Sequence, residues 1–539
     1  MSTKSIFQTA ALALAFLSTL NFQLSTVFAQ GNLTPPGAPA PTMKSLDQIE
    51  PRTPISSVPF TISLSGSYYV TSNLTAGVNQ SGILVAADNV TLDLNGFTLS
   101  GTGGTVGEGV STSGPRVNIV VRNGTVRNWP GSGVNFYDSG ASQTLVQNIQ
   151  SISNVFTGVA VKNSSRVLDC FTVGNGTRGI VVDNECLVEH CKVSGNVYAG
   201  IGAGANSELR NNQITGNGIG LNLTGAGNIV ANNMVKANAD NYSMAQGNQL
   251  DLLLCEVPES IDWPARVKLA GSLNVAVSNA VTITANNVTL DLNGFTISST
   301  FANSLNGGTA ILLANASGNS DITIFNGFIS GGVTYSGGYY TGPGFAYGIY
   351  YSSTPPRSVR VTGVSVSGCA LDGIDLYANI YLNPGNSTIV ESCTVQTTGG
   401  CGIIATAVSH STAYLCGRSA IVADIVSDSY GYGSGTGTDG IDCSSASNCS
   451  GYSAANGDGV NCVSANNCYG FSGGAYGVYA LSANNCFGQS SSGYPGIGAS
   501  IAIGCFGQSS SGAGIQAGIA NSCYSSGGNS AITHAYNMP

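Results

Sequence analysis

The chain has 539 residues, of which 8% are charged, and its formal net charge is −9 with only 17 Lys and Arg residues. So few basic residues form no stripe that could neutralise phosphates, which excludes nucleic acid as a partner, and an acidic chain has no general attraction to anionic lipid. Hydrophobic residues reach 42% and glycines number 74, which is typical of a folded, turn-rich chain and not of a disordered one.

Segment 1–29 has the pattern of an export signal. Lys4 precedes an apolar run from Ala10 to Leu20, and the small residues before Ala29 suit cleavage after it. The apolar run is too short to span a bilayer, and no later segment is long and apolar enough. We therefore predict a secreted protein, extracellular or at the cell surface, without a transmembrane span. Segment 30–50 carries four prolines and is expected to be an extended linker.

A long internal repeat divides the rest of the chain. The phrase NVTLDLNGFT stands at 89–98 and again at 287–296, and similar segments flank both copies. A tandem duplication explains these matches, so we predict a first module at 51–250 and a second at 251–539.

Shorter periods recur inside each module. In the first, asparagines recur every 21 residues, and in the second, glycines and cysteines recur every 18 or 19. The asparagines are Asn154, Asn175, Asn196, Asn217 and Asn238, the glycines are Gly440, Gly459, Gly477, Gly496 and Gly514, and the cysteines are Cys449, Cys468, Cys486, Cys505 and Cys523. Short apolar strands follow the glycines, and repeats of this length with two or three strands are rungs of a β-helix. The sequence therefore predicts an all-β fold, a parallel β-helix or β-solenoid in two tandem modules.

The irregular rung length and the phrase NVTLDLNGFT resemble the pectate-lyase-like right-handed parallel β-helix superfamily, and in particular the secreted β-helix proteins of environmental bacteria. The resemblance covers about residues 50–535 and implies the right-handed type. It also implies a carbohydrate ligand, because enzymes of this superfamily act on acidic polysaccharides along the outer sheet face. Their Gly-His-Gly and Arg-Ile-Lys motifs are absent from this sequence, and no lyase-like set of calcium-binding aspartates with a catalytic arginine stands out.

Outward carboxylates are the first candidates for chemistry. In a strand that begins Gly-(Ile/Val), the second and fourth residues after the glycine point outward. This rule, extended to the residues just before the strands, selects Asp183, Asp372, Asp375, Asp424, Asp439 and Asp442. Such carboxylates could bind Ca²⁺ or act as acid and base, and the alternative is solvated surface charge. Asp375 and Asp442 lie several rungs apart, too far to act as one pair.

Asp93 and Asp291 occupy the same place in the two copies of the repeated phrase. This fixed place predicts a structural role and not a reactive one.

Tyrosines gather in the glycine-rich stretch 331–353, which interrupts the rung rhythm and is predicted to be a loop leaving the solenoid. Exposed tyrosines can stack on sugar rings, and the alternative is a loop folded back on the solenoid. The sugar-stacking candidates are Tyr339, Tyr340, Tyr347, Tyr350 and Tyr351.

The 15 cysteines allow three interpretations. Five of them fall at one place in successive rungs, which predicts a stacked cysteine column. Buried free thiols are favoured, rung-to-rung disulfides are the second alternative, and a metal column is the third. The three histidines lack metal-ligand spacing, so no zinc or copper site is predicted.

Two functions follow from this pattern. The first is a non-catalytic extracellular or surface protein whose side face binds polysaccharide or serves a structural purpose. The second is a polysaccharide lyase or glycoside hydrolase that acts on an acidic polysaccharide along that face. A groove with acidic residues and an Arg or Lys within reach favours the enzyme, whereas a flat Ser, Thr and Asn face favours binding. The oligomeric state is not indicated.

Overall fold

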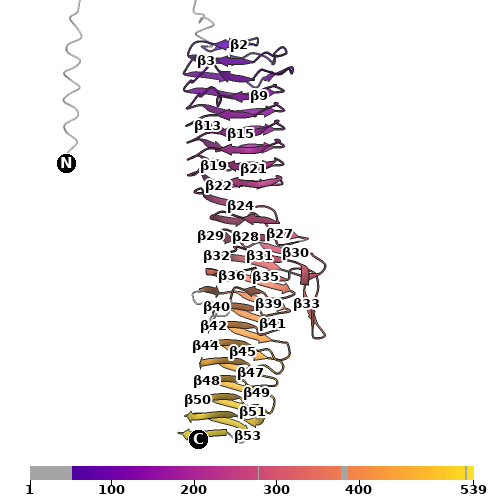
Figure 1. Ribbon diagram of the computed structural model, residues 1–539, viewed down its shortest axis with the longest axis vertical. Helices are drawn as coiled ribbons and strands as arrows, with labels where there is room; N and C mark the ends of the chain where they lie inside the picture. The colour runs from indigo at the N-terminus through magenta and orange to yellow at the C-terminus, as the bar shows by residue number, and fades with distance from the viewer. Residues whose placement is uncertain (1–50, 277, 378–386, 529–530, 539) are drawn as a thin grey trace, which may run out of the picture. The chain divides into compact units, whose positions relative to one another are not determined.

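Parallel strands stacked rung upon rung build the protein in its computed structural model, which describes residues 51–276, 278–377, 387–528 and 531–538 (Figure 1). The predicted all-β solenoid is confirmed, while right-handedness and the division into two modules stay predictions. The export signal and the linker predicted at 1–29 and 30–50 lie outside the described residues. In the part of the chain that the structure describes, no helix has the length and apolar character needed to cross a bilayer.

The strands form three columns, in which each strand pairs in parallel with strands of the rungs before and after it. The first column opens with a nine-stranded sheet: β2 (Phe60–Ile62), β5 (Ile83–Val85), β8 (Val110–Thr112), β10 (Val134–Asn135), β12 (Val159–Val161), β15 (Arg178–Val182), β18 (Ala199–Ala203), β21 (Ile219–Leu223) and β23 (Asp240–Met244). It resumes with β25 (Glu259–Ile261), β28 (Val281–Ile283), β31 (Thr309–Leu313), β35 (Tyr347–Tyr351), β37 (Ile374–Asp375), β40 (Ile403–Ser409), β42 (Ile421–Ser427), β44 (Ile441–Ser447), β46 (Val460–Asn466), β48 (Val478–Asn484), β50 (Ile497–Ile503), β52 (Ile515–Asn521) and β54 (Ala531–Tyr536).

The second column runs beside the first and merges with it at β40, whose C-terminal half pairs with β38. Its strands are β1 (Thr53–Ile55), β3 (Gly66–Val70), β6 (Val90–Asp93), β9 (Ile119–Arg127), β11 (Leu145–Ile152), β13 (Arg166–Leu168), β16 (Leu187–Glu189), β19 (Glu208–Arg210), β22 (Ile229–Lys236), β24 (Gln249–Leu254), β26 (Ala265–Leu269), β29 (Val288–Asp291), β32 (Ser320–Ser330), β36 (Arg357–Cys369) and β38 (Thr388–Glu391).

The third column shares the long strands β9, β11, β22, β32 and β36 with the second. Its own strands are β4 (Leu74–Thr75), β7 (Thr98–Ser100), β14 (Phe171–Val173), β17 (Lys192–Ser194), β20 (Gln213–Thr215), β27 (Leu273–Val275), β30 (Thr296–Ser299), β39 (Thr394–Thr398), β41 (Thr412–Cys416), β43 (Tyr430–Gly433), β45 (Ser450–Ser453), β47 (Tyr469–Ser472), β49 (Phe487–Ser490), β51 (Phe506–Ala513) and β53 (Tyr524–Gly528). Outside the columns lie the antiparallel hairpin β33 (Thr334–Ser336) and β34 (Tyr339–Thr341) and the 3-10 helix η1 (Ser304–Asn306).

The first column is interrupted between β23 and β25, beside the module boundary predicted at residue 250. The second column continues through this region, because β24 pairs with both β22 and β26. The module boundary at residue 250 therefore stays a prediction, because the second column is continuous across it.

Apolar and polar residues alternate along the strands, and the inward apolar side chains fill the core. In the repeated phrase Leu92 and Leu94 are fully buried, as their spacing predicts. The carboxylate of Asp93 accepts a hydrogen bond from the backbone N–H of Asn95 at 2.9 Å, and Asp291 accepts one from Asn293 at 2.7 Å. Both aspartates thus close a turn.

Asparagines at the 21-residue period form a buried amide ladder. The side-chain oxygen of Asn196 accepts bonds from the backbone N–H and the side-chain amide of Asn175, at 3.0 and 2.9 Å. Asn196 in turn donates to Asn217 at 2.9 Å. Stacking satisfies amides that would otherwise be costly to bury.

The predicted cysteine column is also present. Cys505 and Cys523 occupy successive rungs, with the Cys505 backbone N–H 3.4 Å from the Cys523 sulfur. The structure holds all fifteen cysteines as free thiols, and only Cys255 and Cys443 are not fully buried.

Candidate functional site

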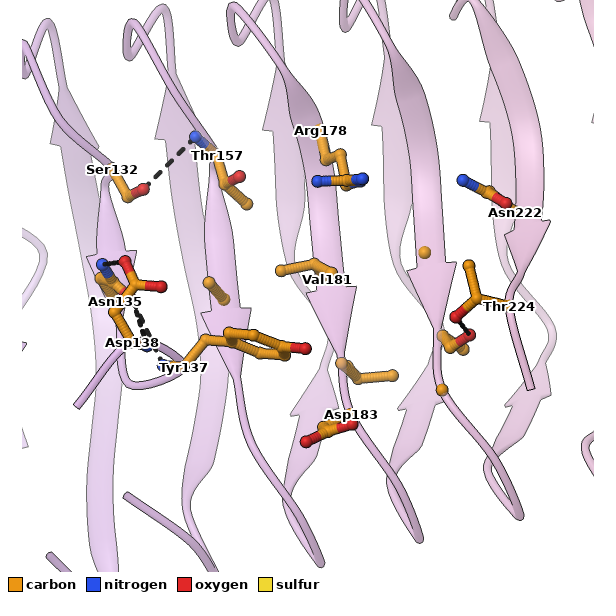
Figure 2. Close-up of a pocket in the computed structure, with 15 residues that line it drawn as sticks. Ser132, Asn135, Tyr137, Asp138, Thr157, Arg178, Val181, Asp183, Asn222 and Thr224 are labelled. Carbon is orange, nitrogen blue, oxygen red and sulfur yellow. Dashed lines mark hydrogen bonds between the residues drawn. The ribbon is translucent and has the colours of Figure 1, made fainter. Parts of the chain in front are cut away.

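A groove of about 260 Å³ lies on the outer face of the nine-stranded sheet, across β10 to β21 (Figure 2). Ala160 and Gly202 stand at outward positions of its floor. Because these residues carry a methyl group or no side chain, the surface is hollow between larger neighbours such as Tyr137 and Arg178. Concave sites of this kind are where proteins bind ligands.

One end of the groove is acidic. Asn135 lies on β10, and its side-chain NH₂ group contacts Glu108 and donates to Asp138 at 2.7 Å. The side-chain oxygen of Asn135 accepts hydrogen bonds from the backbone N–H groups of Tyr137 and Asp138, both at 3.2 Å. One amide therefore holds the two carboxyl groups side by side and fixes the turn that carries Tyr137.

These two carboxyl groups differ in environment. Glu108 is half-buried, and burial raises its pKa, with the nearby charge of Asp138 acting in the same direction and the hydrogen bond from Asn135 opposing both. Asp138 is exposed to solvent. A carboxyl group with a raised pKa beside an exposed carboxylate can divide the roles of acid and base between them.

Arg178, the first residue of β15, makes the groove basic at the start of that strand (Figure 2). The Arg178 guanidinium lies 4.8 Å from the ring centroid of Tyr198, whose hydroxyl accepts a hydrogen bond from Asn222 at 3.3 Å. Among the described residues, no Asp or Glu lies within ion-pair distance of Arg178. Arg178 thus keeps donors for a ligand in the groove.

Asp183, predicted to be outward, also lines the groove. Lys162 sits 3.5 Å from its carboxylate and 4.5 Å from the ring centroid of Tyr137. Since Lys162 is engaged twice, Asp183 and Tyr137 are held in place at the floor edge, and the Asp183 charge is already matched.

A second acidic region lies on the same column farther along. Asp375 is outward on β37, in register with Tyr350 of β35. Burial raises the pKa of Asp375 to about 7, helped by the negative charge of Asp372. Burial also raises the pKa of Asp372, and the positive charge of Arg418 acts against it.

Asp439 and Asp442 form a further group, to which the structure adds Asp458. Asp439 accepts the backbone N–H of Asp458 at 2.7 Å. Burial, followed by the charges of Asp439 and Asp442, raises the pKa of Asp458 to about 7. Two rungs separate Asp375 from Asp442, so the structure places them in separate groups.

Asp424 stands apart from both groups. Its carboxylate accepts a hydrogen bond from the Tyr377 hydroxyl at 3.0 Å. Among the described residues, no set of three or more His, Cys, Asp or Glu side chains is placed to hold a metal ion.

The tyrosine stretch 331–353 is only partly a loop. Tyr339 and Tyr340 belong to the hairpin, which folds back on the solenoid, because the Tyr340 hydroxyl donates to the Leu415 carbonyl at 2.9 Å. Tyr339 is 73% exposed.

The loop prediction is wrong for Tyr347, Tyr350 and Tyr351, which form strand β35 within a rung. Apolar residues of β31 and β37 pair with this segment, and tertiary pairing outweighs its glycine-rich context. The rings of Tyr347 and Tyr350 stack at 4.1 Å.

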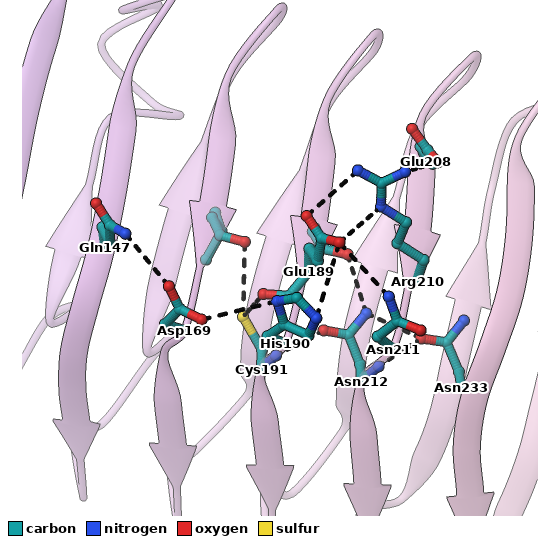
Figure 3. A network of polar contacts seen from close by, with 12 residues as sticks. Gln147, Asp169, Glu189, His190, Cys191, Glu208, Arg210, Asn211, Asn212 and Asn233 are labelled. Carbon is teal, nitrogen blue, oxygen red and sulfur yellow. Dashed lines mark hydrogen bonds and ion pairs between the residues drawn. The ribbon is translucent and has the colours of Figure 1, made fainter.

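A network of paired charges covers β16 and β19 of the second column (Figure 3). Arg210 binds Glu189 at 2.9 Å and Glu208 at 2.8 Å, and hydrogen bonding to Arg210 lowers the pKa of Glu189. Asp169 lies 3.8 Å from His190. The Glu189 carboxylate is therefore stabilised in its charged form, in contrast to Glu108. We interpret the network as surface ion pairs with a structural role.

Sequence reasoning missed Glu108, Asn135, Asp138 and Arg178. Two signals could have found them. Asn135 is the second residue after Gly133, the outward position of the strand rule, and Glu108 and Arg178 each directly precede a rung glycine. Asp372, Asp439 and Asp458 hold the same place before a glycine, so this position forms one edge of the outer face.

Comparison with known proteins adds little. No family model matches the chain, and no curated protein matches it. Among solved structures, it is similar to the catalytic domain of a GH87 alpha-1,3-glucanase (13% identity, TM-score 0.26, covering 69% of this chain and 68% of that one). It is also similar to the tailspike protein of E. coli bacteriophage HK620 (14%, 0.31, 67% and 69%) and to PfbA, a surface adhesin of Streptococcus pneumoniae (13%, 0.26, 70% and 83%). Likenesses at such TM-scores carry no argument about function.

Proposed function

We propose that the exported protein binds an extended polysaccharide along its outer face, in the groove of Figure 2. The observation that carries this proposal is the Arg178 guanidinium, free of a carboxylate partner among the described residues and set beside a hollow floor. Tyr137 supplies an apolar ring, and Asn222 and Asp138 supply groups for hydroxyls at either side. An aromatic surface with a few convergent polar groups is the usual composition of a sugar site.

Arg178→Ala and Tyr137→Ala are each expected to weaken binding of the recognised polysaccharide at least tenfold, because each removes a direct contact worth about 1.4 kcal/mol or more. Affinity electrophoresis and calorimetry on a panel of pectic, alginate-like and neutral polysaccharides would measure this loss. Lys192→Ala is the matched control, since Lys192 also stands over an aromatic ring, that of Phe171 at 5.9 Å, but on the third column. Equal binding by wild type and all three variants would exclude the groove as the polysaccharide-binding site.

A second candidate function is glycoside hydrolysis in the same groove. Acidic residues with Arg178 in one groove are the arrangement expected of an enzyme, and the shared amide contact of Glu108 and Asp138 also favours it. Both carboxyl groups contact one nitrogen atom and therefore lie close together, as the two carboxyl groups of a retaining glycosidase do at about 5 Å. Glu108, with its raised pKa, would be the acid, and the exposed Asp138 the nucleophile. The groove also holds an arginine, Arg178, but the paired carboxyl groups of Glu108 and Asp138 are the arrangement of a hydrolase and not of a lyase.

Glu108→Gln and Asp138→Asn are each expected to reduce the release of new reducing ends by 10²-fold or more, with binding retained. Wild-type activity should fall as pH rises through the raised pKa of Glu108, because the acid must carry its proton. Asp169→Asn is the control, since Asp169 is also exposed but lies between β13 and β14, outside the groove. If a folded sample releases no reducing ends from any polymer that it binds, hydrolysis is excluded for those polymers and binding alone stands.

A further inference from the structure

The C-terminal end of the chain is uncharged. Beyond Asp458 the sequence contains no Asp, Glu, Lys or Arg, and His534 is its single histidine. All of the net charge of −9 therefore belongs to the preceding residues. A surface built from this end repels neither anions nor cations and offers no ion pair to a charged partner.

Two rows of aromatic side chains cover the outer side of the third column over β41 to β53. The rows follow the strand register, in which Tyr452 pairs with Phe471 and Phe487 pairs with Phe506. Neighbouring ring centroids lie 4.5 to 5.3 Å apart. We call this surface the aromatic face; its rows are Tyr414, Tyr432, Tyr452 and Phe471, and Tyr469, Phe487, Phe506 and Tyr524. Phe471 and the whole second row belong to the uncharged end, whereas Tyr414, Tyr432 and Tyr452 precede Asp458.

The backbone beneath the aromatic face is closely packed. Gly451 and Gly470 point inward under the rings, and a Cβ at either would come within 1.9 Å of a carbonyl oxygen of the opposite strand column. The buried hydroxyls of Ser453 and Ser472 donate to the backbone carbonyls of Thr438 and Gly457, in the loops of the preceding rungs, at 2.7 and 2.6 Å. The rings thus need little further ordering on binding, which reduces the entropic cost.

The rings turn their edges, and not their faces, to a partner. Most neighbouring rings are stacked on one another, with interplanar angles as low as 5° between Phe487 and Phe506. A cation would need an open ring face, whereas ring edges carry partial positive charge and suit oxygen atoms. Beyond Phe471 its row continues with Gln489 and Gln508, whose amides add neutral donors and acceptors.

The size of the aromatic face disfavours a second copy as the partner. Seven strands about 4.8 Å apart with two side-chain rows cover roughly 400 Å², half of the ~800 Å² that each partner buries in a stable pair. An extended polymer instead gains affinity by repeating one small contact at every rung. The rung spacing is also close to the length of one sugar residue in such a chain.

We propose that the aromatic face is a second binding surface, specific for an uncharged, extended polysaccharide. It is independent of the groove, because it lies on another column and uses other residues. The partner recognised here is a neutral polymer whose hydroxyls meet ring edges, tyrosine hydroxyls and amides.

The test is sedimentation of the full mature protein with insoluble neutral polysaccharides, cellulose and chitin as probes. The variant Tyr469→Ser/Phe487→Ser/Phe506→Ser is expected to bind at least tenfold less than wild type. Serine suits this place because Ser450 occupies the same register position one rung earlier. Tyr479→Ser is the control, since Tyr479 is 48% exposed on the first column. Should the triple variant unfold, Gln489→Lys/Gln508→Lys places charge on the face without removing a ring and should weaken binding equally.

Each other outcome overturns the inference. Wild type that stays in solution with both polymers, or variants that sediment like wild type, would exclude the aromatic face as a polysaccharide surface. Concentration-dependent dimers that the triple variant abolishes would assign the face to a second copy. Loss of sedimentation in Arg178→Ala alone would place neutral-polymer binding in the groove, which removes this inference and leaves the proposed function intact.

Discussion

Replacing Asn196 by alanine is expected to lower the free energy of unfolding by about 3 to 5 kcal/mol. The Asn196 side chain is 1% exposed, and its oxygen is the acceptor for two donors of Asn175. Alanine leaves both donors of Asn175 without this acceptor, whereas the Asn217 oxygen loses the side-chain donor but keeps the backbone N–H of residue 196. A buried group left unsatisfied costs about 1–3 kcal/mol, and the lost volume adds a cavity.

Urea unfolding followed by circular dichroism would measure this loss. Asn163→Ala is the matched control, because Asn163 accepts the backbone N–H of Asn184 at 3.3 Å but is exposed, so water can replace its amide. The control should cost less than about 1 kcal/mol. In a stacked array the Asn196 variant should unfold first in the rungs around it. Equal losses of stability in both variants would mean that burial does not determine how much the amide ladder contributes to the free energy of unfolding.

The parts of the fold that repeat could be predicted from the sequence, because stacking forces one residue type onto one place in every rung. Asn175 and Asn196 are 21 residues apart and lie directly over one another, and the inward Leu92 follows the period of two. For Tyr347 the glycine-rich context predicts a loop, but the structure shows a strand. The strand β35 is recognised only from its pairing with the neighbouring rungs.

The groove could not be predicted in the same way. Glu108 and Asp138 are 30 positions apart in the sequence. They meet at Asn135 because Glu108 lies one rung before it and Asp138 lies in the turn just after it. The hollow exists because Ala160 and Gly202 have no large side chains. A motif search looks for characteristic functional residues and therefore does not detect small ones of this kind. The strand rule did place Asp183 at the groove edge, since an outward direction depends only on the local alternation of the strand.

Asp375→Asn is expected to remove a pH dependence of stability that wild type shows between about pH 4 and pH 7. Burial, with the charge of Asp372, raises the folded-state pKa of Asp375 to about 7, above its usual value near 3.9. Between these values the folded protein holds a proton that the unfolded chain has released. Stability from this group is therefore complete below about pH 4 and is lost as pH rises through 7.

The wild-type free energy of unfolding should accordingly fall by roughly 2 kcal/mol from pH 4 to pH 8 through Asp375, about half of the unscreened value, since the side chain is partly solvated. Asp458, whose pKa is raised in the same direction to about 7, should contribute a similar fall. Asp375→Asn should equal wild type near pH 4 and exceed it in stability at pH 8. Urea unfolding at pH 4, 5, 6, 7 and 8 would measure both profiles.

Asp321→Asn is the control, since Asp321 is exposed and its replacement should leave the profile unchanged. Parallel profiles for wild type and Asp375→Asn would show that Asp375 is ionised throughout this range and cannot serve as a proton donor near neutrality. A smaller fall in Asp375→Asn than in wild type and Asp321→Asn would instead establish a protonated carboxyl group on the outer face, beside the stacked rings of Tyr347 and Tyr350. Acid catalysis would then have a second candidate donor besides Glu108, and the two can be separated because Asp375 lies outside the groove.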